Sequence, residues 1–263
     1  MSYEFPNAPT DFEWTASQRQ QYNIENYAKL SEEDAALDAA LINGAVEHEL
    51  IGALDSVIEL GVGGVMRGPA FMVPMVRRGG RLHVTDVSES NVIAAEEEMK
   101  RIHRGDLGIW TPHQEHMAKC HPAWRGAFGR TALIATFGQQ HIRHLTEAMA
   151  DGLSLSYVAE SRDPTDGEEE MDPIDAWRRD IALVCRATRR IIHLRQTDES
   201  SGYRVGEEDI DAVSVTCEQT EAELETNGFK ILASHTAPKS GHTRQKGDPH
   251  NFSGFSGILA ERR

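Results

Sequence analysis

The chain has 263 residues, of which 39% are hydrophobic and 26% are charged. This length supports one large α/β domain, or one domain with a modest lid, and the composition is ordinary for a globular protein. The formal net charge of −15 argues against a nucleic-acid partner, because binding a phosphate backbone requires a basic surface.

The N-terminal segment differs in character from the rest of the chain. Its first part is polar and predicts an extended arm. From Ser31 the text SEEDAALDAALINGAVEHELI places apolar residues near helical spacing, after a capping signal made by Ser31 and Asp34. We therefore expect an N-terminal arm with lid helices over residues 1–50 and a main domain over residues 51–263.

Strand-like runs alternate with helical patterns through most of the main domain. Short apolar runs bounded by turn residues indicate buried strands, and a longer period near 3.6 residues indicates helices. In chain order we expect a strand at 56–60 entering a glycine turn, a helix at 68–80, a strand at 81–88, a helix at 89–105, a strand at 131–137, a strand at 153–161, a helix at 172–188, a strand at 189–197 and a helix at 216–229.

The end of the chain breaks this alternation. FKILASHTAP and GFSGILAERR are two strand-like runs with only a polar, glycine-rich stretch between them. Without a crossover helix, two such strands form an antiparallel hairpin. We therefore predict an α/β fold with a seven-stranded, mostly parallel sheet, closed by a C-terminal antiparallel pair and covered by helices on both faces. This ordering is associated with class I S-adenosylmethionine-dependent methyltransferases.

The most informative motif is VIELGVGG at 57–64, followed by VTDVS at 84–88. Glycines after the first strand let a ligand approach the backbone closely, and an acid after the second strand, Asp86, can accept both hydrogen bonds of a ribose diol. In an open parallel sheet these two points meet at the same edge. A nicotinamide-dinucleotide site is less favoured, because its third glycine would fall at Met66. A purely structural turn is the third alternative.

Four segments resemble one branch of the methyltransferases, the nicotinamide, phenylethanolamine and thioether methyltransferase family with its actinobacterial small-molecule relatives. They are YNIENYAKL at 22–30, VTDVSESNV at 84–92, SYVAESRDP at 156–164 and the stretch from SSGYRVGEED to GFKI at 200–231. The resemblance spans most of the chain, whereas residues 104–140 match poorly. It implies a Rossmann-like class I methyltransferase that uses S-adenosyl-L-methionine and releases S-adenosyl-L-homocysteine.

The resemblance also implies roles for individual residues. The glycine turn would face the methionine part of the cofactor, Asp86 would bind the ribose with help from Asn91, and lid tyrosines would cover the site. The family's adenine-contacting acid at the end of the third strand is missing, so only Thr136 and Phe137 stand in its place. The expected cofactor-binding residues are Tyr22, Tyr27, Gly61, Val62, Gly63, Asp86, Val87, Asn91, Thr136, Phe137 and Tyr157.

Methyl transfer from a sulfonium is an in-line displacement, so alignment of the acceptor is the main requirement. The expected catalytic residues are Tyr27 from the lid, Glu160 after the fourth strand and Asp198 after the fifth, with Gln196 or Thr197 as alternatives to Asp198. A carboxylate there would bind an amine and help to remove its proton. The resemblance favours the nitrogen of a small molecule in specialised metabolism, such as antibiotic biosynthesis. An oxygen or carbon acceptor, or an inactive cofactor-binding protein, remains an alternative.

The remaining constellations predict little chemistry. HQEHMAKCH at 113–121 could bring histidines and Cys120 to one helix face, but a pocket wall or ordinary surface is favoured and we expect no metal. The three cysteines lack metal-ligand spacing and predict reduced thiols. With neither a signal-like leader nor a long apolar run in the sequence, we expect a cytoplasmic protein without membrane or nucleic-acid partners. A homo-oligomer stays open.

Overall fold

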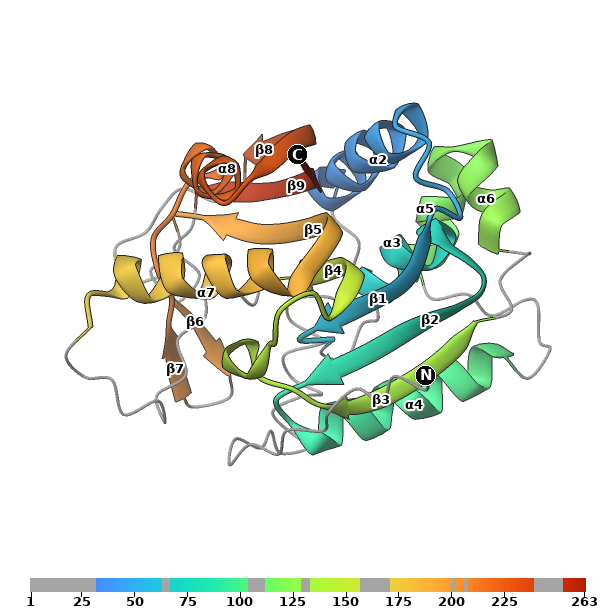
Figure 1. Cartoon of the computed structure of the whole chain (residues 1–263), viewed down its shortest axis with the longest axis horizontal. Helices are drawn as coiled ribbons and strands as arrows, with labels where there is room; N and C mark the ends of the chain where they lie inside the picture. Colours follow the sequence, from blue (N-terminus) through green and yellow to red (C-terminus); the bar gives the residue numbers. More distant parts are fainter. Residues whose placement is uncertain are drawn as a thin grey trace.

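The protein forms one central sheet with helices on both sides (Figure 1). The computed structural model describes residues 32–62, 67–103, 112–128, 133–156, 171–199, 202–205, 208–238 and 253–263. Within these ranges no helix is long and apolar enough to cross a membrane.

The sheet has seven strands in the order β3-β2-β1-β4-β5-β9-β8. All neighbours pair in parallel except β9, which runs antiparallel to both β5 and β8. The predicted seven-stranded, mostly parallel sheet with a C-terminal antiparallel pair is therefore confirmed. The strands are β1 (Leu54–Leu60), β2 (Val76–Asp86), β3 (Ile134–Gln139), β4 (Ala150–Ser156), β5 (Thr188–Asp198), β8 (Phe229–Pro238) and β9 (Gly254–Arg262).

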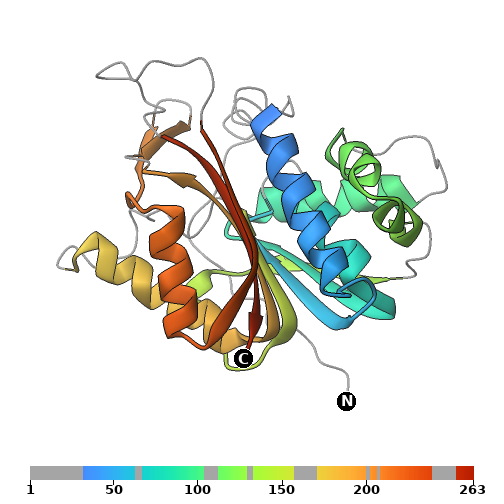
Figure 2. The same ribbon diagram turned by 90° about the horizontal axis from the view of Figure 1, so that it is seen from above.

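Helices cover the two faces unequally (Figure 2). One face carries a core shared by five helices, and the other carries a core built with α7 and α8. We call the first the α2 face and the second the α8 face. The helices of the α2 face are α2 (Glu32–Glu47), α3 (Arg67–Met72), α4 (Glu89–His103), α5 (Pro112–Cys120) and α6 (Pro122–Phe128), and those of the α8 face are α7 (Pro173–Ala187) and α8 (Cys217–Thr226).

The helices form where spacing and caps predict them. On α7 the side chains of Trp177, Ile181 and Val184 follow a helical period and are all buried. The helix begins at Pro173, and the side chain of Asp172 before it accepts a hydrogen bond from the backbone N–H of Ile174. Such a cap satisfies one of the free amides of the first turn. Helix α2 packs against β8 and β9 and contributes to the same core as β1 and β2, whereas the predicted arm lies outside the described residues.

Several predicted element boundaries were wrong. The helix expected at 68–80 ends at Met72, a 3₁₀ turn follows at Val73–Met75, and β2 already begins at Val76. Pro74 lacks an amide hydrogen and ends the α-helix early. The third strand runs two residues further than expected, to Gln139, because its polar end still pairs with β2. Helix α6 and a small separate hairpin of β6 (Gly202–Val205) and β7 (Glu208–Asp211) were not predicted.

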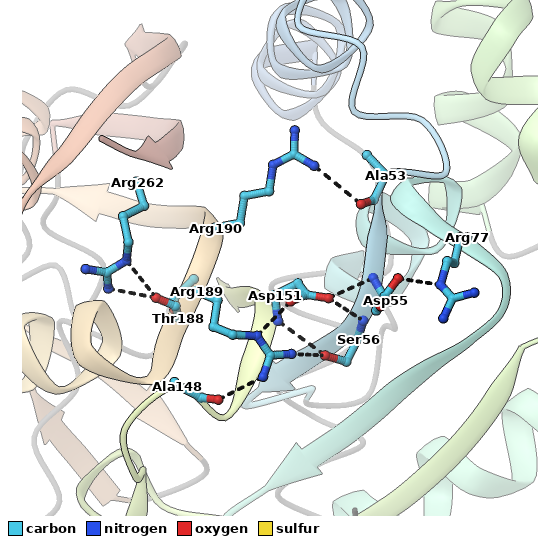
Figure 3. Close-up of polar contacts among 10 residues, drawn as sticks. All are labelled: Ala53, Asp55, Ser56, Arg77, Ala148, Asp151, Thr188, Arg189, Arg190 and Arg262. Atoms are coloured by element: carbon cyan, nitrogen blue, oxygen red, sulfur yellow. Dashed lines mark hydrogen bonds and ion pairs between the residues drawn. The ribbon is translucent and has the colours of Figure 1, made fainter.

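Charged and polar residues bind the amino-terminal edge of the sheet together (Figure 3). Asp151 Oδ2 accepts hydrogen bonds from the backbone N–H groups of Asp55 (2.8 Å) and Ser56 (3.2 Å) on β1. Its other carboxylate oxygen accepts from Arg189 Nε on β5 at 2.7 Å. Arg189 also donates to Ser56 Oγ and to the carbonyl of Ala148. We call these five residues the amino-edge network, and it joins β1, β4 and β5 at the end opposite to the glycine turn.

Candidate functional site

The glycine turn lies directly beside the end of β2. The backbone N–H of Val62 donates to the carbonyl of Thr85 at 2.9 Å, and Thr85 Oγ1 donates to the carbonyl of Glu59 at 2.6 Å. Gly61 has a φ of 69°, a left-handed conformation that favours glycine. The expectation that β1 and β2 end side by side is confirmed, so Gly61 and Asp86 share the carboxyl edge of the sheet.

Asp86 is held in place by residues that follow it. Its Oδ1 accepts hydrogen bonds from the backbone N–H of Ser88 at 3.0 Å and from Asn91 Nδ2 at 3.2 Å. Both Asp86 and Asn91 are nearly enclosed, with 4% and 3% of their surface exposed. The amide oxygen of Asn91 is buried and has no hydrogen-bond partner among the described residues. Asn91 therefore orients the carboxylate, and its expected part in ribose binding stays a prediction.

The end of β3 supplies two further polar side chains beside Asp86. Thr136 and Phe137 pair with His83 and Val84, whereas Gln139 pairs with Asp86 itself. Gln139 Nε2 donates to the carbonyl of Val87 at 3.2 Å. Because the strand continues beyond Phe137, Thr136 and Phe137 lie short of the edge at which we expected them.

The next residue, Gln140, completes this corner. Its backbone N–H donates to the carbonyl of Asp86 at 3.0 Å, and its side chain is buried. The side-chain oxygen Oε1 of Gln140 finds no partner within the described part of the chain. Gln139 and Gln140 were missed because the third strand was expected to end at Phe137.

Three buried polar residues line up across the α2 face. Glu59 on β1, Ser154 on β4 and His193 on β5 are in register with one another. Ser154 Oγ lies 2.9 Å from His193 Nδ1, and Ser154 is also a hydrogen-bond partner of Glu59. Burial raises the pKa of Glu59 well above its usual range, against the lowering effect of Ser154, and the nearby charge of Asp86 raises it further. We call Glu59, Ser154 and His193 the polar row.

A buried ion pair lies two positions further along β5. Arg195 Nη1 donates to Asp38 Oδ1 on α2 at 2.6 Å, and both side chains are fully buried. The pair ties the helix that follows the N-terminal arm to the carboxyl half of β5. On the same face, the buried hydroxyl of Ser156 on β4 has no partner among the described residues.

Asp198, the expected acid after β5, lies on the opposite side of the sheet. Its Oδ1 accepts from Ser256 Oγ at 2.6 Å and from Gln196 Nε2 at 3.1 Å. Gln196 in turn accepts from Thr220 on α8, so Gln196 and Asp198 both face α8. Burial raises the pKa of Asp198, while these two hydrogen bonds lower it. By strand alternation, Thr197 faces the side on which Asp86, Arg195 and the polar row lie.

Gly63, the lid tyrosines and the residues after β4 lie outside the described residues: Tyr22, Tyr27, Gly63, Tyr157 and Glu160. The helix carrying the cysteine-histidine cluster is α5, where Cys120 Sγ lies 3.3 Å from His116 Nε2. Burial raises the pKa of Cys120 to about 11, so it is a thiol at neutral pH. Among the described side chains, no group of three or more could hold a metal ion.

Ser154, His193 and the ion pair were not predicted, although the sequence of β5 contains a signal for His193 and Arg195. Strands covered by helices on both faces normally read as continuous apolar runs. In β5 the run RRIIHLRQT instead places His193 and Arg195 two positions apart, on either side of the apolar Leu194. Polar residues with this spacing in a central strand all point to one face, and they mark the α2 face as chemically unusual.

Comparisons with known proteins agree with this architecture. No protein-family model and no curated protein matches the chain. A proposed sarcosine dimethylglycine methyltransferase from Galdieria sulphuraria aligns with a TM-score of 0.51 at 8% identity, over 94% of this chain and 98% of its own. A proposed methyltransferase from Haloferax volcanii, solved with the Trm112 methyltransferase activator, gives 0.50 at 9% identity, over 95% and 99% of the two chains.

A third structure, the CurJ carbon methyltransferase, gives a TM-score of 0.50 at 13% identity, over 93% of this chain and 57% of its own. At such low identity these likenesses speak for the fold alone, because one fold hosts many activities. Together with the strand order and the antiparallel β9, they show that the chain has the Rossmann-like fold of class I methyltransferases.

Proposed function

We propose that this protein is an S-adenosylmethionine-dependent methyltransferase that acts on a small molecule. One observation carries the proposal, the 2.9 Å hydrogen bond from Val62 N–H to the Thr85 carbonyl. This bond holds the bare backbone at Gly61 next to the carboxylate of Asp86. The two lie at the carboxyl edge, where the strand order reverses between β1 and β4. Open α/β sheets bind their ligands at such a switch point.

The described residues offer a partner for each part of the cofactor. The backbone of Gly61 and Val62 would face the methionine part, and Asp86, oriented by Asn91, would accept the ribose hydroxyls. The amide groups of Gln139 and Gln140 at the end of β3 would face the adenine, where the family has an acid. The antiparallel β9 between β5 and β8 favours this cofactor over a nicotinamide dinucleotide.

For the acceptor we propose a nitrogen atom of an amine or heterocycle in specialised metabolism, on the resemblance to the nicotinamide and phenylethanolamine branch. The acceptor would lie at the carboxyl ends of β4 and β5 on the α2 face. Holding it in line with the methyl group can account for roughly 7–11 kcal/mol of the barrier. Tyr27 and Glu160 are proposed to cover the acceptor and to take its proton. The engagement of Asp198 with Ser256 and Gln196 supports a structural role for that acid instead.

Titration calorimetry tests the cofactor assignment. S-adenosylmethionine and S-adenosylhomocysteine should each bind at one site per chain, and NAD should not compete. Binding of NAD in preference to both would support a dinucleotide enzyme, and binding of none of them would end the methyltransferase proposal. If the cofactor binds, turnover on a panel of amines separates an active enzyme from an inactive binding protein. Tyr27→Phe should then lower turnover more than it lowers cofactor affinity.

A further inference from the structure

The polar row is unusual because it puts an acid, a hydroxyl and an imidazole into the protein core. Glu59, Ser154 and His193 are each almost fully buried. Buried polar groups are tolerated when they hydrogen-bond one another, and the central Ser154 contacts both of its neighbours. A serine hydroxyl donates one hydrogen bond at a time, so the row has a direction.

The surroundings hold each member in place. A Cβ atom added at Gly68 of α3 would meet the carboxyl group of Glu59 at 1.9 Å, so the acid fills the space against that glycine. The ring of Phe71, also on α3, stacks on His193 with centroids 4.0 Å apart. Glu59 therefore packs against Gly68 and His193 against Phe71, and the protons of the row can rearrange without movement of either side chain.

With a neutral His193, two arrangements of protons satisfy the row. If Glu59 is protonated, it donates to Ser154, and Ser154 donates to His193 Nδ1. If Glu59 is ionised, Ser154 donates to Glu59, and His193 donates through Nδ1. A neutral histidine carries its proton on one ring nitrogen only, so the two arrangements require different tautomers of His193.

The charge of the cofactor can select between these arrangements. S-adenosylmethionine has a sulfonium and an ammonium against one carboxylate, whereas S-adenosylhomocysteine lacks the sulfonium charge. The charge of Asp86 on β2 acts on Glu59, His193 lies beyond Ser154, and Gly68 on α3 carries no titratable group. The buried Arg195–Asp38 pair lies two positions beyond His193 along β5, on the same face. A positive charge placed at the glycine turn, two residues from Glu59, favours the ionised acid.

We propose that Glu59, Ser154 and His193 form a hydrogen-bond chain that reverses direction when S-adenosylmethionine binds. The Glu59 proton passes to the Ser154 oxygen, the former Ser154 proton passes to His193 Nδ1, and His193 releases its Nε2 proton. One proton thus leaves the row, Ser154 donates to the ionised Glu59, and His193 has changed tautomer. The row acts as a positioning device that links the cofactor turn on β1 to the strand β5 that also holds the Arg195–Asp38 pair. This inference rests on the proposed function, because it requires the cofactor to occupy the glycine turn.

Calorimetry in two buffers with different heats of ionisation tests the proton release. At neutral pH the wild-type protein should release up to about one proton per S-adenosylmethionine bound. As long as the pH lies below the pKa of Glu59, affinity should increase by up to about tenfold for each unit by which the pH is raised. S-adenosylhomocysteine should release less. Glu59→Gln, which mimics the neutral acid in shape, should bind the cofactor without this release. A release that is absent in the wild type, or that persists unchanged in Glu59→Gln, would overturn the inference.

The tautomer of His193 gives a second readout that needs no change at Glu59. In histidine-labelled protein, the ¹⁵N shifts of His193, assigned by their loss in His193→Gln, should switch between the two tautomer patterns when S-adenosylmethionine is added. In Ser154→Ala they should no longer respond. If the wild type binds the cofactor and the ¹⁵N shifts of His193 do not change, this inference is overturned but the proposed function is not. Failure of the wild type to bind either ligand would instead end the proposed function, and the inference with it.

Discussion

The two edges of the sheet use polar residues in opposite ways. At the amino-terminal edge, the carboxylate of Asp151, the guanidinium of Arg189 and the hydroxyl of Ser56 satisfy one another and nearby backbone groups (Figure 3). At the carboxyl edge, buried oxygens of Glu59, Asn91 and Gln140 find no partner among the described residues. An unpaired buried polar group is destabilising by about 1–3 kcal/mol.

This difference distinguishes polar residues that stabilise the fold from polar residues that are left available to a ligand. A closed network stabilises the fold and has nothing left to offer a ligand. Unpaired acceptors at the carboxyl edge lower stability, and a ligand that supplies donors, such as a ribose or an adenine amine, would offset that loss. The comparison therefore predicts that variants at the amino edge change stability alone, while those at Asp86 change binding.

The largest effect is expected at the buried pair of Arg195 and Asp38. Asp38→Asn removes the buried carboxylate that Arg195 contacts in the core, which should lower the free energy of unfolding by about 3–5 kcal/mol. Asp55→Asn is the matched control, because the Arg77–Asp55 pair at the amino edge is more than half exposed and such pairs contribute about 0–1 kcal/mol. Urea denaturation measures both. Equal losses in the free energy of unfolding for the two substitutions would show that the buried pair contributes no more to stability than the exposed pair.

Within the amino-edge network, Asp151→Ala should lower the free energy of unfolding by roughly 1–3 kcal/mol. It removes the acceptor for two backbone N–H groups of β1 and for Arg189. The affinity of the Asp151→Ala variant for S-adenosylhomocysteine should equal that of the wild type when both are measured well below the melting temperature. A loss of affinity in this variant would mean that the two edges are not independent.

The converse is expected at Asp86. Asp86→Asn keeps an acceptor for the Ser88 N–H but loses the carboxylate that would hold a ribose diol, so affinity should fall by about 1–3 kcal/mol, roughly 5- to 150-fold. Calorimetry with S-adenosylhomocysteine measures the change, and the melting temperature serves as a control for folding. Unaltered affinity would place the ribose elsewhere.

The smallest effect is a pH dependence set by His83 in the interior of β2. Burial lowers the pKa of His83 to about 4, from the ordinary value of 6.5. Its folded-state pKa lies below the unfolded one, so stability is complete above pH 6.5 and falls as the pH drops toward 4. Between pH 6.5 and 5.5 the loss should be about 1 kcal/mol. The slope should disappear in His83→Gln, and a slope that survives there would belong to other groups.

Much of the fold could be predicted because it is encoded locally. Apolar periodicity located most of the helices and strands, and the missing crossover before GFSGILAERR predicted the antiparallel strand that became β9. The position of Gly61 and Asp86 at the same edge of the sheet followed from a general rule on where parallel strands end. The predicted start of the second strand was wrong because the apolar residues up to Met75 continue a helical pattern. Only the pairing within the sheet shows that Val76 begins β2.

The parts that could not be predicted depend on contacts between distant residues. Asp38 and Arg195 are 157 positions apart, and nothing local in either segment indicates the other. The polar row likewise forms only when β1, β4 and β5 come into register. Gln139 and Gln140 were missed for a simpler reason, because polar residues at a strand end look like the beginning of a loop.

A crystal structure with S-adenosylhomocysteine tests the central claim most directly, namely that the glycine turn on β1 and the acid on β2 hold one adenosyl ligand between them. We predict the ribose hydroxyls within hydrogen-bond distance of the Asp86 carboxylate and the amino-acid part of the ligand against the backbone of Gly61 and Val62. A ligand bound elsewhere, or an adenosine that leaves Asp86 and Gly61 untouched, would contradict it.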